Sequence, residues 1–183
     1  MLKWPFHITL LLAPLAYAIH HSEENLYFDF RDWRLRYFAD NNALTTEAIF
    51  VLLTAITIAF IISATVLRTR AASWCVILFL MGSQIVNAIF HLGATIVFQD
   101  FSPGLITGLL VYLPVNFVIL RAALRDGIVT PIQLLVLFFI GAAMFAVFEA
   151  VGPIILIAFG LVSVAWISFS VWQERASSKW QEA

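Results

Sequence analysis

Charged residues and cysteine are scarce in this sequence of 183 residues. Only 11% of its residues are charged, and its formal net charge at neutral pH is −1. Nucleic-acid binding depends on clustered Lys and Arg, so this composition argues against a nucleic-acid partner. The single cysteine, Cys75, excludes a disulfide within the chain and excludes zinc motifs that are built from pairs of cysteines.

Apolar residues, by contrast, are abundant. They make up 62% of the chain, above the roughly 45–50% that is usual in soluble domains. Several apolar stretches reach or approach the length of about 20 residues that a helix needs to cross a bilayer. We therefore predict the all-α class: a polytopic membrane bundle of about six transmembrane helices with one interfacial amphipathic helix. Residues 1–183 would form a single integral membrane domain, with membrane lipids as partners.

One apolar stretch is too long for a single span. The residues from Pro131 to Trp172 would form roughly 63 Å of helix, about twice the thickness of the hydrocarbon core of a bilayer. We expect the chain to reverse at Val151-Gly152-Pro153. The predicted spans are residues 4–20, 44–67, 74–98, 103–120, 131–150 and 153–172.

The first apolar stretch also has features of a secretory signal peptide. It follows Lys3 and ends in Ala16-Tyr17-Ala18, which is typical of a cleavage site. Cleavage after Ala18 would leave the polar residues from His20 to Glu24 at a loose terminus. We therefore interpret the stretch as a short first span.

Aromatic and charged residues alternate between the first two spans. Leu26, Phe30, Trp33 and Tyr37 recur at helical spacing within residues 26–38. This pattern predicts a helix that lies in the outer membrane interface with its rings facing the bilayer. We expect it to roof the site described below.

The basic residues predict the orientation, because positively charged loops stay on the cytoplasmic side of a membrane. Six spans place seven of the ten basic residues on one side and leave Arg31, Arg34 and Arg36 on the other. We therefore expect both termini to be cytoplasmic, in a bacterial cytoplasmic membrane. The seven residues are Lys3, Arg68, Arg70, Arg121, Arg125, Arg175 and Lys179.

The most informative polar residues follow the first span. In an α-helix, at about 100° per residue, Glu23 and Glu24 lie about 60° and 40° to either side of His20. One imidazole and two carboxylates can then point at one spot. The alternative is a cluster that is merely solvated in the headgroup layer.

A second pair lies in the third predicted span. Asn87 and His91 are four residues apart, so they share one helical face. The six-span topology places His91 roughly 10 Å inside the outer end of its span. An ionisable side chain at that depth is costly unless it has a partner, which makes His91 a functional candidate.

Together the two motifs resemble the HXXEE family of integral membrane proteins, in which an HxxEE motif at the end of the first span precedes an NxxxH motif in a later one. The similarity covers about residues 20–120. It implies a suspected metal-binding or enzymatic domain, with no established reaction for the family. The residues that carry it are His20, Glu23, Glu24, Asn87, His91, Ser102-Pro103-Gly104, Thr107 and Pro114.

Two imidazoles with two or three carboxylates suit a divalent metal such as zinc, iron or manganese, which accept mixed nitrogen and oxygen ligands. The candidate metal ligands are His20, Glu23, Glu24, His91 and Glu149. Glu149 is included because it lies at the outer end of the fifth predicted span. We expect Asn87 to orient His91 or a ligand carboxylate. Glu23, Glu24 and Asn87 are the candidate catalytic residues, and no residue is assigned to an organic cofactor.

These residues favour a membrane-embedded, metal-dependent enzyme with a site near the outer face and a lipid or other apolar substrate. Two further hypotheses use the same residues. A metal-free isomerase or cyclase would use them to move protons, and a small transporter or metal permease would use them as a transient binding site. The transporter needs a polar path toward the cytoplasm, for which the inner halves of the spans offer few polar residues. A purely structural or accessory subunit is a fourth hypothesis.

Gly104 and Gly108 form a GxxxG pattern in the fourth predicted span. Such a pattern allows two helices to approach closely, either within one chain or across a dimer. The Gly104/Gly108 face is therefore the candidate surface for a homo-oligomer.

Overall fold

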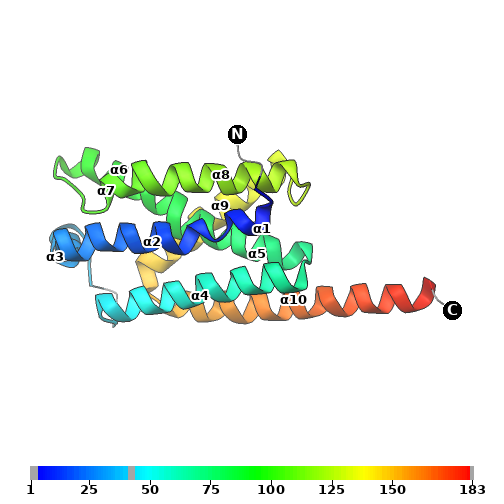
Figure 1. Cartoon of the computed structure of the whole chain (residues 1–183). Helices are drawn as coiled ribbons and strands as arrows, with labels where there is room; N and C mark the ends of the chain where they lie inside the picture. Colours follow the sequence, from blue (N-terminus) through cyan, green and yellow to red (C-terminus); the bar gives the residue numbers. More distant parts are fainter. Residues whose placement is uncertain (1–3, 41–43, 182–183) are drawn as a thin grey trace.

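The structure is a computed structural model that describes residues 4–40 and 44–181, with side chains as far as Ser177. Every regular element in these ranges is a helix, so the predicted helical membrane bundle is confirmed. The long helices lie side by side, and α3 lies at one end of the bundle (Figure 1). Five helical stretches in the described residues are long and apolar enough to cross a membrane: Thr46–Leu67, Arg70–Phe98, Leu105–Arg125, Pro131–Val151 and Ile154–Ser177.

The first apolar stretch is two helices, α1 (Phe6–Thr9) and α2 (Leu12–Ser22), where the sequence predicted one. Proline has no N–H group, and its ring clashes with the carbonyl four residues earlier, which for Pro14 is that of Leu10. The helix accordingly breaks there, and Pro14 lies in the first turn of α2, where proline is tolerated. Because of this break, α1–α2 is not among the five candidate spans, and its crossing of a membrane stays a prediction.

Threonine side chains cap three of the later helices. Thr45, Thr69 and Thr130 each accept a hydrogen bond from a backbone N–H in the first helical turn that follows them. These caps provide acceptors for N–H groups that have no partner within the helix itself. The remaining helices are α3 (Phe30–Tyr37), α4 (Thr46–Leu67), α5 (Arg70–Leu80), α6 (Asn87–Phe98), α7 (Leu105–Thr107), α8 (Leu113–Arg125), α9 (Pro131–Val151) and α10 (Ile154–Gln181).

Three π-helical segments interrupt the α-helices. They are η1 (Glu23–Tyr27) after α2, η2 (Met81–Val86) between α5 and α6, and η3 (Gly108–Tyr112) between α7 and α8. Such segments are rare and occur frequently at functional sites, because they change the direction of the side chains that follow. All three lie next to the polar motifs singled out in the sequence.

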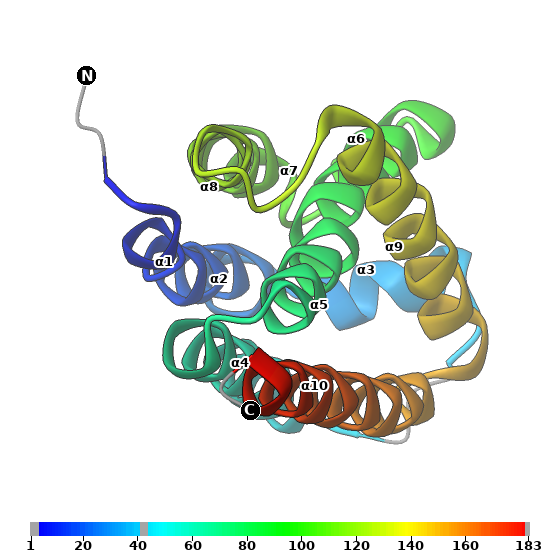
Figure 2. The same ribbon diagram turned by 90° about the vertical axis from the view of Figure 1, so that its right-hand side faces the viewer.

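The rod formed by α5, η2 and α6 lies at the centre of the bundle. In its most apolar stretch of 18 residues, 61% is buried, whereas in the corresponding stretch of α9 only 11% is buried. Figure 2 shows this rod surrounded by α2, α8, α9, α4 and α10. Side chains on the outer faces of the surrounding helices, such as Ile62, Phe139 and Leu161, are exposed, as contact with lipid requires.

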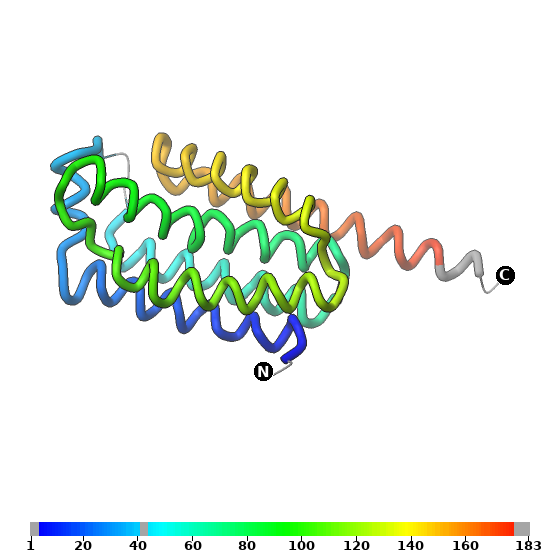
Figure 3. Tube along the Cα trace, turned by 90° about the horizontal axis from the view of Figure 1, so that it is seen from above, coloured from blue at the N-terminus to red at the C-terminus, as the bar shows by residue number. Residues whose placement is uncertain are grey.

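The two ends of the bundle differ. Both α1 and the end of α10 lie at one end, and α10 extends beyond its neighbours there (Figures 1 and 3). At this end the backbone N–H of Phe6 donates to Asp126 Oδ2 over 2.7 Å. A hydrogen bond from Arg125 is the main reason that the pKa of the Asp126 carboxyl lies below its usual value. The hydrogen bond from Phe6 joins α1 to the loop between α8 and α9.

At the opposite end, α3 covers the bundle. The Asp29 side chain caps α3 by accepting from Asp32 N, and Trp33 is buried against Phe98. The Tyr37 hydroxyl donates to Asp100 Oδ2, a bond that raises the pKa of that phenol. The predicted interfacial segment, residues 26–38, thus contains α3 but also the end of η1, where Leu26 is exposed.

Candidate functional site

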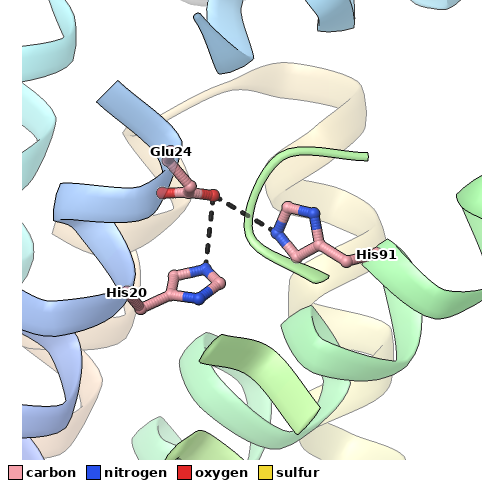
Figure 4. A group of neighbouring side chains, drawn as sticks. All are labelled: His20, Glu24 and His91. Carbon is pink, nitrogen blue, oxygen red and sulfur yellow. Dashed lines mark ion pairs between the residues drawn. The ribbon is translucent and has the colours of Figure 1, made fainter. Parts of the chain in front are cut away.

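The α3 end of the bundle contains a group of three potential metal ligands. His20 lies in α2, Glu24 in η1 and His91 in α6. Glu24 Oε1 is 3.3 Å from His20 Nε2 and 3.2 Å from His91 Nε2, and the three ligand atoms all lie within 4.8 Å of one another. Figure 4 shows the carboxylate facing both imidazoles. The structure therefore joins the two sequence motifs in one site.

The two Nε2 atoms that face this point are buried and have no hydrogen-bond partner in the described part of the chain. The side chains of His20 and His91 are almost fully inaccessible. Although both Nε2 atoms are near Glu24 Oε1, neither contact has the alignment of a hydrogen bond. The two contacts are ion pairs where an imidazole is protonated, and an ion held between the three ligand atoms would pair both nitrogens when they are neutral.

The other ring nitrogen of His20 is fixed by Thr107. His20 Nδ1 is 2.9 Å from Thr107 Oγ1, and the Thr107 hydroxyl donates to Glu23 Oε2. A hydroxyl has a single hydrogen, so Thr107 Oγ1 accepts from the N–H at His20 Nδ1. In a neutral imidazole this leaves a lone pair on Nε2, which is the form that binds metals.

His91 is held in a similar way. Its Nδ1 is 2.9 Å from Ser102 Oγ, and the backbone N–H of Ser102 donates to Thr95 Oγ1. Ser102 is fully buried at the start of the Ser-Pro-Gly turn. This contact turns Nε2 of His91 toward Glu24. Ser102 thus orients His91, and the expectation that Asn87 orients His91 or a ligand carboxylate stays a prediction.

Glu23 binds the Ser-Pro-Gly turn and the start of α7. Its Oε1 accepts from the backbone N–H groups of Gly104 and Ile106, and its Oε2 accepts from the backbone N–H of Thr107. The positive end of a helix favours a carboxylate at this position. Glu23 thus supports Thr107 and does not join the three grouped ligand atoms, although the sequence placed it among the candidate ligands.

Gly104 lets the turn pass close to both imidazoles. Its φ of +99° is rarely adopted by residues with side chains, and a Cβ atom there would lie 2.8 Å from His20 Cε1 and from His91 Nε2. Gly108 faces the same interior: its Cβ would lie 3.3 Å from Ala88 of α6. The close approach that the GxxxG pattern permits is thus used within this chain.

Aromatic rings contact both imidazoles. Tyr112 stacks on the His20 ring, with centroids 4.2 Å apart, and Phe30 of α3 contacts the His91 ring at 5.2 Å. These contacts limit water at the site and fix the planes of both imidazoles. Tyr112 could not be recognised as a site residue from the sequence, because it lies outside the two motifs.

Two predicted site residues are not among the grouped ligands. The Glu149 carboxylate accepts hydrogen bonds from Arg34 Nε and Nη2, at 3.2 and 2.9 Å, and so links α9 to α3. Asn87 is half-buried, and within the described residues its Oδ1 has no hydrogen-bond partner. Both residues nevertheless line the cavity that reaches the site.

This cavity has a volume of about 170 Å³. His20 and Glu24 lie on its wall. Arg31 and Arg34 of α3 also line it, at the α3 end of the bundle. Most of the wall is apolar, as is common in sites for small organic ligands. Its apolar lining includes Leu53, Leu78, Phe90, Phe145, Phe148 and Leu156.

The three side chains fit a divalent metal ion. Ligand atoms at about 2.0–2.2 Å from a tetrahedral ion lie roughly 3.3–3.5 Å apart, close to the two distances found here. In that arrangement each lone pair points about 35° away from the line between two ligand atoms, which agrees with the poor hydrogen-bond alignment. Two imidazoles and one carboxylate also suit zinc, iron or manganese chemically. The group can therefore hold a metal.

Comparison with known proteins agrees with the position of the site. The uncharacterized protein YrkK of Bacillus subtilis (strain 168) is 52% identical over 60 residues, which are 32% of this chain and 37% of that protein. The matched region thus spans little more than a third of that relative. No solved structure matches the chain. The profile of the family described as "Protein of unknown function with HXXEE motif" matches residues 11–119, more than half of the sequence, and the chain belongs to this HXXEE family.

Proposed function

We propose that the protein is a membrane-embedded, metal-dependent enzyme that acts on a lipid or other apolar substrate. The observation that carries this proposal is the convergence of Glu24 with the buried Nε2 atoms of His20 and His91, which have no hydrogen-bond partner among the described residues. A bound zinc, iron or manganese ion would supply Lewis acidity toward an oxygen atom of the substrate. The protein's own residues would hold the ion, exclude water and position the substrate.

The number of ligands supports a catalytic role over a structural one. Structural zinc sites are usually closed by four protein ligands, whereas catalytic sites have three and keep an open position. The grouped ligand atoms here come from three residues. The carboxylate of Glu23, which is used to hold Thr107 and the turn, supports the ligands from outside the group.

The cavity supports an apolar substrate. It joins the ligand group to a wall of leucine and phenylalanine side chains from α4, α5, α6, α9 and α10. A substrate that enters between these helices would leave its hydrocarbon part among apolar side chains and its reacting part at Glu24.

The transporter hypothesis is less well supported by the packing beyond the site. Gln84 and Asn116 are bonded to each other at 2.7 Å, and Gln84 Nε2 donates to Ala13 O. Both side chains are almost fully buried. Toward the α1 end, the packed side chains of Leu10, Val76 and Ile119 follow. A permeating ion would have to displace this packing.

We infer that both termini are cytoplasmic and that the site faces the outer side. The distribution of basic residues supports this orientation, although Lys3 and the side chain of Lys179 lie outside the described residues. In a Cys75→Ala background, single cysteines at Tyr27 and Ser177 should react with impermeant reagent from opposite sides of the membrane. Reaction from the same side would contradict this topology.

Replacing Thr107 by valine should weaken metal binding without preventing the fold. Valine has a similar shape but removes the hydroxyl that joins His20 Nδ1 to Glu23. Loss of such an orienting group typically costs about 10–100-fold in metal affinity. Competition with a chelator would measure the change, and Thr65→Val at an exposed position of α4 is the matched control. An unchanged affinity in Thr107→Val would show that this hydroxyl does not fix His20.

Enzymatic activity itself can be tested with defined lipids. Purified protein loaded with zinc, iron or manganese would be incubated in phosphatidylcholine vesicles that contain isoprenoid and fatty alcohols, and products would be identified by mass spectrometry. We expect a product with wild-type protein and with His7→Ala, but none with Glu24→Gln. Turnover that survives complete metal removal would favour the metal-free isomerase or cyclase. Absence of any product across the series would count against this substrate class.

A further inference from the structure

The cavity that reaches the ligand group has a charged end and an apolar end. At the α3 end it is lined by Arg31 and Asp40, which pair at 3.0 Å and whose side chains are 43% and 42% exposed. The helices α4 and α10 run from this end toward the α1 end, and α5 runs the opposite way (Figure 1). On these three helices, the lining residues farthest from α3 are therefore Leu53 of α4, Leu78 and Phe79 of α5, and Leu156 of α10.

Three phenylalanine rings pack together at the apolar end. The ring centroid of Phe79 in α5 is 5.6 Å from that of Phe60 in α4 and 6.1 Å from that of Phe159 in α10. Phe60 and Phe159 also contact each other, with centroids 5.3 Å apart. One turn beyond Phe79 in α5, Cys75 and Val76 are 1% and 0% exposed. The accessible space along α5 therefore ends at Phe79, and the other two rings lie behind it.

The grouped metal ligands lie toward the charged end of the cavity. On the central rod the lining residues extend from Phe79 to Phe90, and Phe90 directly precedes His91. At 1.5 Å per residue, these two phenylalanines are separated along the rod by roughly 16 Å. A ligand whose polar end lies at Glu24 would therefore direct its hydrocarbon end toward Phe79.

We propose that Phe79, backed by Phe60 and Phe159, closes the deep end of the cavity and limits the chain length of the apolar ligand that binds there. That this ligand is the substrate rests on the proposed function, whereas the length limit needs neither metal nor turnover. An apolar cavity of about 150 Å³ holds one benzene ring, so the cavity of about 170 Å³ takes only a short stretch of hydrocarbon. Extra methylene groups would press on close-packed rings, which resist them.

The test uses straight-chain alcohols of increasing length that carry fluorine at the end of the chain. Binding to the full chain in phosphatidylcholine nanodiscs is measured by fluorine NMR against empty nanodiscs, which corrects for partition into lipid. Wild-type affinity should fall by at least about fivefold once the chain exceeds the cavity, the effect of forcing methylene groups into a packed site. Phe79→Ala should move this fall to chains longer by about two to six carbons, since it frees the space of a six-carbon ring and the neighbours relax partly into it.

Two further variants accompany this one. Phe79→Leu removes less volume and costs less stability, so it should shift the limit in the same direction by a smaller amount. The control is Phe139→Ala, which removes a ring that is exposed on the outer face of α9 and should leave the limit unchanged. Circular dichroism of each variant shows whether it has folded, and Phe79→Leu decides the test if Phe79→Ala has not.

Three results would overturn the inference. They are binding of no alcohol in the series by the wild-type protein, wild-type binding with no length limit, and an unchanged limit in the folded variants of Phe79. The metal content of the same samples separates this inference from the proposed function. A length limit set by Phe79 without bound metal would support the inference and contradict the metal-dependent enzyme. Bound metal without a length limit would overturn the inference and leave the metal site standing.

Discussion

Replacing His91 by alanine should abolish metal binding by the purified protein. His91 Nε2 is one of three grouped ligand atoms, and its side chain is completely buried. Loss of a group that merely orients a ligand costs about 10–100-fold in metal affinity, so loss of a ligand should cost more. We expect an affinity lower by more than about 100-fold, measured by elemental analysis after dialysis against a weak chelator.

The helical bundle should survive this substitution, because the helices are held together by packing over their whole length. Circular dichroism in detergent should therefore show unchanged helix content. His7→Ala is the matched control, since His7 lies in α1 at the opposite end of the bundle (Figure 1). Full metal retention in His91→Ala would exclude the three-ligand site. A loss of metal that also occurs in His7→Ala would mean that the protein is damaged generally.

Replacing Gly104 by alanine should damage the site almost as severely, although Gly104 has no side chain to bind anything. The added Cβ would lie 2.8 Å from His20 Cε1 and from His91 Nε2, and real Cβ atoms do not approach other atoms so closely. Both imidazoles would have to move. The φ of +99° adds strain of about 1–3 kcal/mol for a residue other than glycine. We expect metal affinity to fall by at least about tenfold, the effect of disturbing one orienting contact, with a lower midpoint of thermal unfolding.

Gly93→Ala is the control for this substitution. Gly93 lies in α6, two residues after His91, and a Cβ there would meet nothing within 4 Å. Alanine in a helix interior is more favourable than glycine by about 0.5–1 kcal/mol, so Gly93→Ala should be neutral or stabilising. If Gly104→Ala bound metal as well as Gly93→Ala does, the close approach of the turn to the imidazoles would be wrong.

The sequence was sufficient to predict the fold class, and it included His20, Glu24 and His91 among five candidate ligands. The scarcity of charge and the long apolar runs require lipid as the solvent, and helices satisfy their backbone hydrogen bonds there. The four-residue spacing between His20 and Glu24 places both on one helical face, and the structure brings them together at 3.3 Å. The break between α1 and α2 follows from Pro14, a local signal that the interpretation as one continuous span did not use.

The distinct roles of Glu23 and Glu24 were not predictable from an ideal α-helix. At about 100° per residue both would face His20. In the structure they lie in the π-helical segment η1, and Glu23 binds the N–H groups of the Ser-Pro-Gly turn instead. That turn lies about 80 residues away in the chain, and contacts of this separation are set by the packing of whole helices. The Glu149–Arg34 pair is unpredictable for the same reason.

Binding of one metal ion by His20, Glu24 and His91 can be tested by X-ray absorption spectroscopy of the purified protein, loaded with one equivalent of zinc in detergent. We expect scattering from two imidazoles with Zn–N distances of about 2.0–2.1 Å, one carboxylate oxygen and no sulfur ligand. Zinc that remains fully hydrated, or zinc whose spectrum is unchanged in His20→Ala, would contradict it.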